Sequence, residues 1–407
     1  MISMRATAAG TRLENELLLS CARSCVSPER PERVRSLLRE EIDWEYLLRT
    51  ASRHGVLPLL YRRLNDTCPD AVPAPVLNRL RDDFHDNARR NLLLAGELLK
   101  LVSLLGAHGI PAIPYKGPVL AASLYGNLSL RQFCDLDIMV RREDVARARE
   151  MLMSHGYRPA HYPTRALETA HLEAMYHCEF DAADGRVQVE LHWAPAWSYL
   201  FSYPEAQRLW ERLETVSFAG KEILTFSPED LLLLLCLHGG KHTWQRLGWI
   251  CDVAKLLVVH KGMDWGWVMR RAHAVGSERM VFLGFFLASD VLGTVLPKDV
   301  LRRVRADPVV GSLAAWVRQR LFREAKWRLR GFERFLFYLK MKPGLPERIL
   351  YCLGFGRKVI IPTVLEWELM PLPDFLFPVY YLLRPMRLAA KYWFGPVKRI
   401  CSGNHAG

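Results

Sequence analysis

The spacing of hydrophobic positions changes along the chain, and its first part has the spacing of helices. Over residues 34–64 and 87–109, apolar residues recur at intervals of three and four, which is the period of an amphipathic helix. Gly109 and Pro111 mark the end of the second segment. We therefore expect residues 1–95 to form an N-terminal helical region.

A strand-forming pattern follows between residues 96 and 225. Residues 110–118 are a short extended segment broken by prolines, and residues 133–140 are rich in strand-forming side chains. Residues 175–193 predict a hairpin in which Ala-Asp-Gly supplies the turn. Expected helices between these strands are residues 119–127 and 142–156. This order predicts an α+β core, with a mixed sheet and helices packed against it.

The helical period returns at Ser227, which has the features of an N-cap. Pro228 follows at the first helical position, and two acidic residues complete the first turn. We expect residues 226–340 to form a C-terminal helical domain. Residues 341–407 are rich in proline, aromatic and basic residues, and we expect an irregular tail packed on that domain.

No segment has the features of a membrane span or a signal peptide. The longest apolar stretch, residues 280–296, contains Asp290 and is shorter than the ~20 residues that span a bilayer. No continuous apolar run precedes Glu14. The nine cysteines show no paired C-x-x-C spacing, which is typical of reduced thiols. We therefore expect a cytoplasmic protein in which residues 280–296 form a buried helix.

The net charge of +13 indicates an attraction to polyanions. Phosphate ligands, nucleic acid and an anionic membrane surface all fit this charge, and the charge alone does not choose among them.

Two carboxylates, Asp135 and Asp137, interrupt the apolar strand at 133–140. Alternate side chains of a strand share a face, so these two point the same way. Two carboxylates this close repel each other unless a cation lies between them. Mg²⁺, which is held by one or two carboxylates together with substrate phosphates, fits such a position. A lone D-x-D pair is also typical of an exposed turn or an edge strand.

The second strand of the expected hairpin offers a third carboxylate. Its aliphatic residues occupy one face, so Glu190 and His192 lie on the other. If this strand lies beside residues 133–140, three carboxylates come together. Such a set could hold two metal ions that stabilise the attacking and leaving oxygens of a phosphoryl or nucleotidyl transfer.

Positively charged residues that could bind phosphate precede the aspartates. Gly117 stands at the start of an expected helix, where backbone N–H groups can approach a phosphate, and Lys116 adds a positive charge. Arg131 could contact the same triphosphate. Each of these features is also typical of an ordinary tight turn.

A row of polar residues follows in the first part of the C-terminal helical domain. We expect one helix face to carry the residues that recur at intervals of four and three, which are His238, His242, Gln245, Trp249 and Asp252. A zinc-protease helix requires a glutamate where Gly239 stands, so zinc is disfavoured. Two interpretations stay open: a polar face over the site, with Lys241 or His242 near the phosphates, or a hydrogen-bonded interface between two domains.

A basic stretch at residues 302–334 interleaves arginines with aromatic residues. These residues are Arg302, Arg303, Arg318, Arg320, Arg323, Arg328, Arg330, Trp316, Phe322 and Trp327. Such a stretch could bind RNA or an anionic membrane surface. It is also typical of a solvated helix face.

Three blocks in this order resemble the uncharacterised bacterial nucleotidyltransferase family of the DNA polymerase beta superfamily. They are YKGPVLAASLYGNLSLRQFCDLDIMVRREDV (115–145), VQVELHW (187–193) and LLLLLCLHGGKHTWQRLGWICDVAKLL (231–257). The resemblance implies a polymerase-beta-like mixed sheet that binds an NTP, such as ATP, and Mg²⁺ or Mn²⁺. It also implies transfer of an NMP from the NTP to an acceptor.

Carried over by position, the resemblance makes Asp135 and Asp137 the paired metal ligands. It makes Glu190 the third carboxylate, which binds the catalytic metal and helps to activate the acceptor hydroxyl. Gly117 falls in the glycine-containing turn, although Lys116-Gly117 stands in place of the usual Gly-Ser or Gly-Gly. The gap from Gly117 to Asp135 is also longer than usual.

The acceptor stays open between a small molecule and a protein hydroxyl. RNA is an alternative acceptor, as in toxin-like relatives that modify tRNA. A non-catalytic binding or assembly module is the alternative of another class, although three retained carboxylates argue against it.

Overall fold

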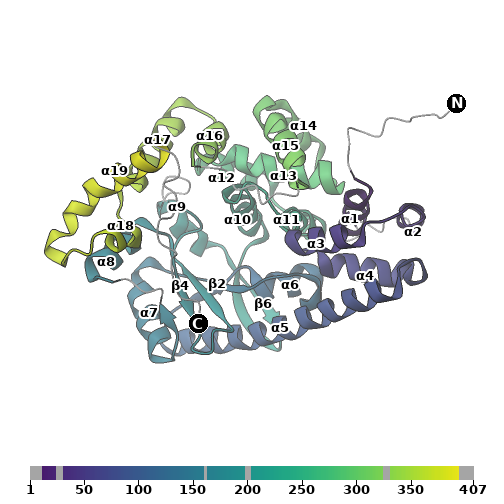
Figure 1. The fold of residues 1–407 in the computed structure, drawn as a ribbon, viewed down its shortest axis with the longest axis horizontal. Helices are drawn as coiled ribbons and strands as arrows, with labels where there is room; N and C mark the ends of the chain where they lie inside the picture. Colours follow the sequence, from purple (N-terminus) through teal and green to yellow (C-terminus); the bar gives the residue numbers. More distant parts are fainter. Residues whose placement is uncertain (1–11, 24–30, 160–162, 198–202, 324–330, 394–407) are drawn as a thin grey trace, which may run out of the picture.

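A five-stranded mixed sheet lies between helices contributed by both ends of the chain (Figure 1). The computed structural model describes residues 12–23, 31–159, 163–197, 203–323 and 331–393. The predicted α+β class, with a mixed sheet and helical regions on either side of it in the sequence, is confirmed. The division into four regions stays a prediction.

The N-terminal region is helical, as its spacing predicts. Its elements are α1 (Leu13–Arg23), α2 (Pro31–Leu37), α3 (Trp44–His54), α4 (Leu57–Thr67), η1 (Pro69–Ala71) and α5 (Ala74–Ala107). Helix α5 has 34 residues and runs from these helices to beneath the sheet (Figure 1). It begins before the predicted residue 87 because Val76, Leu77 and Leu80 continue its apolar face.

The sheet has the strand order β1-β2-β5-β4-β3. Its strands are β1 (Ala112–Pro114), β2 (Asp135–Val140), β3 (Arg158–Pro159), β4 (His177–Asp181) and β5 (Gln188–His192). Strands β2 and β5 are parallel, and all other neighbours are antiparallel. The predicted hairpin at 175–193 is the β4–β5 pair, and its second strand lies directly beside the strand that carries the aspartates.

Helices and a second hairpin surround the sheet. The helical elements are α6 (Gly117–Tyr125), η2 (Leu128–Leu130), η3 (Arg142–Asp144), α7 (Val145–Ser154), α8 (Arg165–Ala174), α9 (Tyr203–Arg208) and η4 (Leu209–Glu211). The hairpin of β6 (Leu213–Phe218) and β7 (Lys221–Phe226) is absent from our sequence prediction. Its turn, Ala219-Gly220, has positive φ at both residues, as a tight two-residue hairpin requires.

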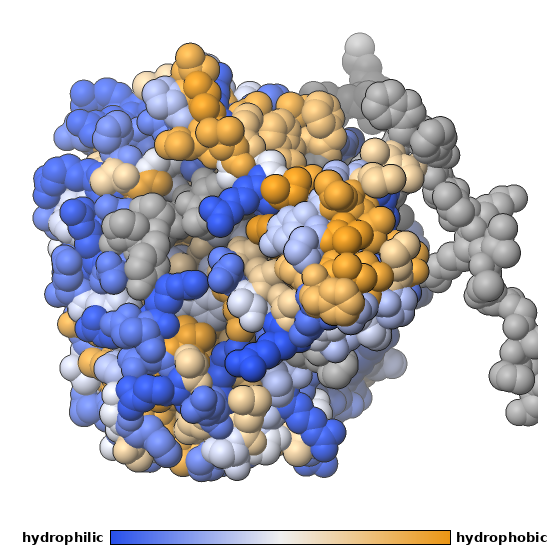
Figure 2. Space-filling model, turned by 90° about the vertical axis from the view of Figure 1, so that its left-hand side faces the viewer, coloured by the Kyte–Doolittle hydropathy of each residue, from blue (hydrophilic) through white to orange (hydrophobic). Residues whose placement is uncertain are grey.

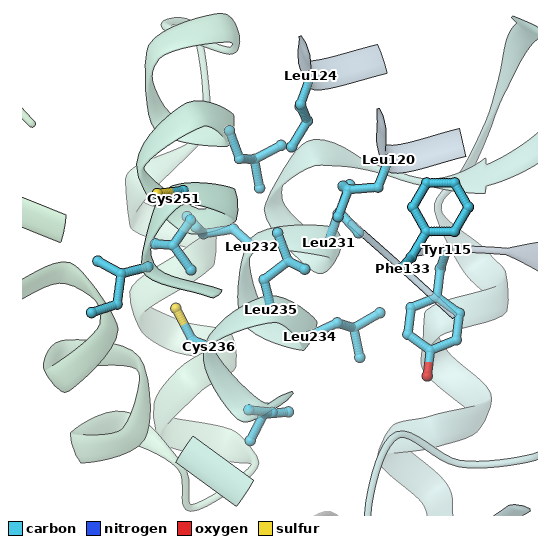
Figure 3. Packing of buried hydrophobic residues seen from close by; sticks show 14 of the residues in the cluster. Tyr115, Leu120, Leu124, Phe133, Leu231, Leu232, Leu234, Leu235, Cys236 and Cys251 are labelled. Carbon is cyan, nitrogen blue, oxygen red and sulfur yellow. The ribbon is translucent and has the colours of Figure 1, made fainter. Parts of the chain in front are cut away.

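The first C-terminal helix begins as predicted. Ser227 is the N-cap of α10 (Pro228–Lys241), and its Oγ accepts the N–H of Asp230. The following helices are α11 (Leu247–Val259), α12 (Trp265–Ala274), α13 (Glu278–Leu292), α14 (Lys298–Ala306) and α15 (Pro308–Leu321). The leucines of α10 pack against Leu120 and Leu124 of α6, which joins the helical region to the sheet (Figure 3).

Helix α13 is the buried helix expected at 280–296. Ten of its fifteen residues are buried, and α10, α11 and α15 pack around it. In the described part of the chain, no helix is both long and apolar enough to cross a membrane.

The last described segment is mostly helical, in place of the irregular tail that its prolines suggested. It contains α16 (Gly331–Met341), α17 (Leu345–Ile360), α18 (Val364–Leu369), η5 (Asp374–Val379) and α19 (Tyr380–Trp393). Pro346 lies in the first turn of α17, where a missing N–H costs nothing. Thr363 and Glu366 form a capping box at α18. These helices extend away from the sheet on one side of the molecule (Figure 1).

His54 connects the N-terminal helices to the C-terminal helices. It is fully buried at the end of α3, and its Nδ1 accepts the N–H of Leu247 at 3.1 Å. Its ring also lies edge-on to Phe322. Burial, and then the neighbouring charge of Arg53, lowers the pKa of His54 to about 3. The folded protein therefore keeps this imidazole neutral at pH values where the unfolded chain protonates it.

We expect the stability of the fold to decrease as the pH falls below about 6.5. Protonation of His54 in the unfolded chain alone should cost about 2 kcal/mol at pH 5 relative to pH 8, because each pH unit below the unfolded pKa contributes about 1.4 kcal/mol. The measurement is urea denaturation at both pH values. His54→Asn keeps an acceptor for Leu247 and should remove this contribution of about 2 kcal/mol from the pH dependence. His273→Asn, at a side chain that is 79% exposed, should leave the pH dependence unchanged.

Candidate functional site

Polar side chains from three neighbouring strands share one face of the sheet. Asp137 of β2 lies directly beside Glu190 of β5 in the parallel ladder. Glu190 in turn faces Glu179 of β4, and His192 faces His177. Because alternate residues of a strand point to the same face, this register gathers the polar side chains of all three strands in one place.

A cavity of about 520 Å³ opens over this face. All eight candidate residues line it, namely Lys116, Gly117, Arg131, Asp135, Asp137, Glu190, Lys241 and His242. They come from β2, β5, the start of α6, the segment before β2 and the end of α10. The structure therefore brings residues from five parts of the chain to one hollow.

Asp137 is buried and carries its charge against a lysine. Its Oδ1 forms an ion pair with Nζ of Lys116, which is also buried. Burial alone would raise the pKa of Asp137, but the charge of Lys116 and a hydrogen bond from His192 outweigh it and hold the pKa well below its usual range. Lys116 also lies 3.5 Å from Nδ1 of His238. Its ammonium therefore neutralises Asp137 at the base of the cavity.

His192 joins the two facing carboxylates. Its Nε2 lies 3.2 Å from Oδ1 of Asp137 and 3.1 Å from Oε2 of Glu190. An ionised carboxylate only accepts hydrogen bonds, so Nε2 carries the proton and donates it to both. Burial raises the pKa of Glu190, but this hydrogen bond and the neighbouring imidazole outweigh burial and lower it to about 2. His192 thus fixes the orientation of both carboxylates.

Asp135 stands at the edge of this cluster. The ligand atoms of Asp137, Glu190 and His192 all lie within 4.8 Å of one another, and Asp135 is not part of that group. It lines the same cavity, where burial and then the charge of Asp137 raise its pKa to about 6. A divalent cation would favour the ionised form of Asp135. The converging carboxylate oxygens of Asp137 and Glu190 fit a hard cation such as Mg²⁺ or Mn²⁺, and Asp135 lines the same cavity.

A second group of potential ligands adjoins the first through Glu190. It consists of His177, Glu179 and Glu190, again with ligand atoms within 4.8 Å. Glu179 is absent from the sequence prediction, although a signal exists. The turn at Asp184-Gly185 fixes the hairpin register, and this register places the His-x-Glu of β4 opposite the Glu-x-His of β5.

Gly117 allows the helix α6 to begin close to the aspartate strand. Its φ is +54°, a conformation that side-chain-bearing residues rarely adopt. A Cβ at this position would lie 3.4 Å from the backbone oxygen of Asp135. The start of α6 therefore lies against the first residue of β2, at the wall of the cavity.

Arg131 makes its main contacts with a carboxylate of the C-terminal helices. Its Nε lies 2.9 Å from Oδ1 of Asp252, and its Nη2 lies 2.9 Å from Oδ2. Tyr125 also donates to Asp252, and Asn91 of α5 donates to the backbone oxygen of Arg131. Among the described residues, Nη1 of Arg131 has no hydrogen-bond partner. Arg131 thus links the sheet to α11.

The prediction of a single helix face from His238 to Asp252 is wrong. Helix α10 ends at Lys241, and Thr243 and Trp244 both have a φ of 54° before α11 begins. The reason is the fully buried indole of Trp244, which lies against Gly239. A Cβ on Gly239 would come within 2.4 Å of this ring. A side chain at position 239, such as the glutamate of a zinc protease, would clash with the ring of Trp244.

The turn between α10 and α11 nevertheless brings His238, His242 and Trp249 to the cavity. Trp249 packs against the rings of His238 and His242, with centroids 5.3 and 5.1 Å apart. Burial, and then the charge of Lys241, lowers the pKa of His242 to about 3, so this imidazole is neutral near pH 7. Neither histidine belongs to a three-residue ligand group in the described chain.

Lys241 projects from the end of α10 towards Tyr176. Its Nζ donates to the Tyr176 hydroxyl at 2.9 Å, and burial, followed by the charge of Lys116, lowers its pKa to about 8. Tyr176, Trp197 and Arg334 also line the cavity. The sequence contains no signal for them, because they adjoin the site only through the packing of distant segments.

The basic stretch at 302–334 is only partly within the described residues. Arg328, Arg330 and Trp327 lie outside them. Arg302 pairs with Asp299 at 2.6 Å, and Arg318 pairs with Asp290 at 2.8 Å. These contacts are typical of a solvated helix face. Binding of RNA or a membrane surface by this stretch stays a prediction.

Comparison with known proteins gives one match. The model of a family described as uncharacterised nucleotidyltransferase matches residues 40–293. No curated protein and no solved structure matches the chain.

Proposed function

The chain belongs to this uncharacterised nucleotidyltransferase family, and we propose that it transfers an NMP from an NTP to an acceptor oxygen with the help of Mg²⁺ or Mn²⁺. The family resemblance predicted from the sequence is confirmed, because all three blocks lie within residues 40–293. The metal, the nucleotide, the acceptor and the role of each residue are parts of the proposal.

The observation that carries the proposal is the direct pairing of Asp137 and Glu190 on adjacent strands at the base of the cavity. Asp135, Asp137 and Glu190 would hold the metal ions. When bound, such ions would stabilise the negative charge that develops on the attacking and leaving oxygens. The adjoining pair His177 and Glu179 lies close enough to Glu190 to support a second ion or to orient this carboxylate.

The remaining residues of the cavity fit the triphosphate. Lys116 and Lys241 place two positive charges on the same hollow as the carboxylates. The start of α6 at Gly117 offers backbone N–H groups, which are suited to bind phosphate at a helix N-terminus. Arg131 lines the same cavity and adds a third positive charge, although Asp252 already balances it.

The expected reaction forms a bond between the acceptor oxygen and the α-phosphorus of the NTP. The bond to the bridging oxygen breaks, and pyrophosphate leaves. His192 holds Asp137 and Glu190 in place during this step. Glu190 would accept the proton where the acceptor is a hydroxyl. A cytoplasmic location, where NTPs are available, belongs to the same proposal.

The test is incubation of the full chain with each α-labelled NTP and Mg²⁺ or Mn²⁺, with separate RNA, protein, lipid and metabolite pools. We expect label from at least one NTP to enter one pool, and EDTA to prevent it. Transfer to RNA would support the toxin-like alternative. If the chain binds neither an NTP nor Mn²⁺ and transfers no label, the protein is a binding or assembly module and the proposal is wrong.

A further inference from the structure

A second, larger cavity adjoins the candidate site. It has a volume of about 1160 Å³ and lies between α16, α17 and α19. Arg334 lines both cavities. Lys358 of the second cavity lies 3.4 Å from the ring centroid of Trp197, which lines the first. The two hollows therefore meet at these three side chains.

The second cavity differs from the first in chemistry. Most of its lining is apolar, and the apolar side chains are Phe332, Phe335, Phe355, Val359, Leu388 and Ala389. Among the described residues, no carboxylate lines it. An apolar hollow of this size beside a polar site fits a molecule with a long hydrophobic part.

The junction of the two cavities is positively charged. Arg334, Lys358 and Arg384 line the second cavity, and Lys241 lines the first. Arg384 is paired with Glu366, whereas Lys358 forms no ion pair with a described residue. Burial, and then the charges of Arg334 and Arg384, lowers the pKa of Lys358 to about 7. A bound anion would relieve this repulsion, so the junction is complementary to a negatively charged group.

The surface around the second cavity is hydrophobic as well. Of the 21 large hydrophobic residues exposed in the described chain, fourteen lie between Leu345 and Met386. Leu345, Leu353 and Leu369 are each about two-thirds exposed or more, and Phe375 is 80% exposed. Figure 2 shows hydrophobic side chains gathered on the side of the molecule where α17–α19 lie. A concentration of this kind marks a surface that binds a membrane or another protein, and the adjoining apolar cavity with its basic junction favours the membrane.

We propose that the acceptor of the nucleotide is a lipid phosphate drawn from a membrane surface. Its hydrocarbon part would occupy the cavity between α16, α17 and α19, and its phosphate would lie at Arg334 and Lys358, facing the carboxylate site. The exposed apolar residues of α17–α19 would contact the bilayer while the lipid enters. This inference rests on the proposed nucleotidyl transfer and names its acceptor.

The chemical step balances without a further reactant. An oxygen of the lipid phosphate monoester, already ionised, attacks the α-phosphorus of the NTP. A new P–O bond forms, the bond from the α-phosphorus to the bridging oxygen breaks, and pyrophosphate leaves with the electron pair. The product is a lipid linked to the nucleoside through a pyrophosphate. No proton has to be removed from the acceptor, which suits a junction lined by cations.

The test combines vesicle binding with label transfer by the full chain. Three kinds of vesicle are compared. The first contains phosphatidylcholine only, the second also contains phosphatidic acid, and the third contains phosphatidylserine in place of phosphatidic acid at the same negative charge. Glycerol 3-phosphate serves as a water-soluble phosphate monoester. With α-labelled NTP and Mg²⁺ or Mn²⁺, we expect label in the organic phase only with phosphatidic acid. We also expect the chain to float with the vesicles that contain phosphatidic acid in the absence of NTP.

Two variants probe the two parts of the lipid site. Val359→Trp fills the apolar cavity, and Lys358→Gln removes a charge at the junction. Each should reduce transfer to phosphatidic acid by at least about tenfold, while binding of labelled NTP is retained. The matched control is Val295→Trp at a position that is 89% exposed and does not line this cavity, and it should change neither transfer nor flotation.

Several results would overturn the inference while leaving the proposed function intact. They are equal transfer to glycerol 3-phosphate and phosphatidic acid, transfer only to RNA or protein, or transfer to lipid that Val359→Trp does not change. The lipid would also be excluded as acceptor if the chain floats with the vesicles but transfers the label only to another acceptor. A chain that neither binds nor uses any NTP would overturn both proposals at once.

Discussion

Asp137→Asn should reduce nucleotidyl transfer by at least about a thousandfold, which corresponds to a barrier higher by about 4 kcal/mol. The substitution keeps the shape of the side chain but removes the charge that the proposed metal ions require. Asp137 is also the carboxylate that faces Glu190 and shares the hydrogen-bond donor His192 with it, so its loss affects the centre of the cluster. The measurements are transfer of α-label and Mn²⁺ binding by electron paramagnetic resonance, and both should be lost.

A matched control separates catalysis from folding. Asp181→Asn makes the same chemical change on β4, at an exposed residue that does not line the cavity, and should retain full transfer. The thermal midpoint of Asp137→Asn reports any cost of leaving Lys116 without its counter-charge. Full transfer and Mn²⁺ binding in Asp137→Asn would exclude Asp137 as a ligand. They would direct attention to His177, Glu179 and Glu190.

Asp252→Ala should destabilise the fold by about 3–5 kcal/mol, the usual cost of removing one partner from a buried ion pair. Both side chains are nearly inaccessible, at 12% exposed for Arg131 and 4% for Asp252. The variant would leave the Arg131 guanidinium buried beside an alanine, and Tyr125 would lose its acceptor. Urea denaturation followed by circular dichroism measures this change.

Asp290→Ala is the appropriate comparison, because it removes the partner of Arg318 in an exposed ion pair. An exposed pair contributes about 0–1 kcal/mol, so this variant should be close to the wild type. Equal costs for the two substitutions would show that the Arg131–Asp252 pair does not hold the sheet against α11.

The sequence predicts those parts of the site that depend on local periodicity. Alternation along a strand places Asp135 and Asp137 on the same face of β2, and Glu190 and His192 on the same face of β5. The structure lays these two strands side by side. The same reasoning could have located Glu179 from the hairpin turn. It could also have located the β6–β7 hairpin from the Ala219-Gly220 turn between two alternating segments.

Features that depend on distant packing could not be predicted in this way. Helix α10 ends at Lys241 because the indole of Trp244 fits a space left by Gly239 and Gly284. Gly284 lies 45 positions further along the chain than Gly239. The ion pair of Lys116 with Asp137, and the presence of Arg334 at the cavity, require the complete fold. The spacing of hydrophobic residues within a segment is the same whether or not the segment makes such contacts, so it cannot predict them.

The position of Glu190 is fixed by two ladders at once, since β5 pairs with β2 on one side and with β4 on the other. An insertion of one residue in β5 ahead of Glu190 would turn this carboxylate to the opposite face of the sheet, away from Asp137. Insertions between Ala182 and Arg186 would only lengthen the hairpin turn. Among descendants of this chain, length changes should therefore accumulate in the turn and be eliminated from the strand.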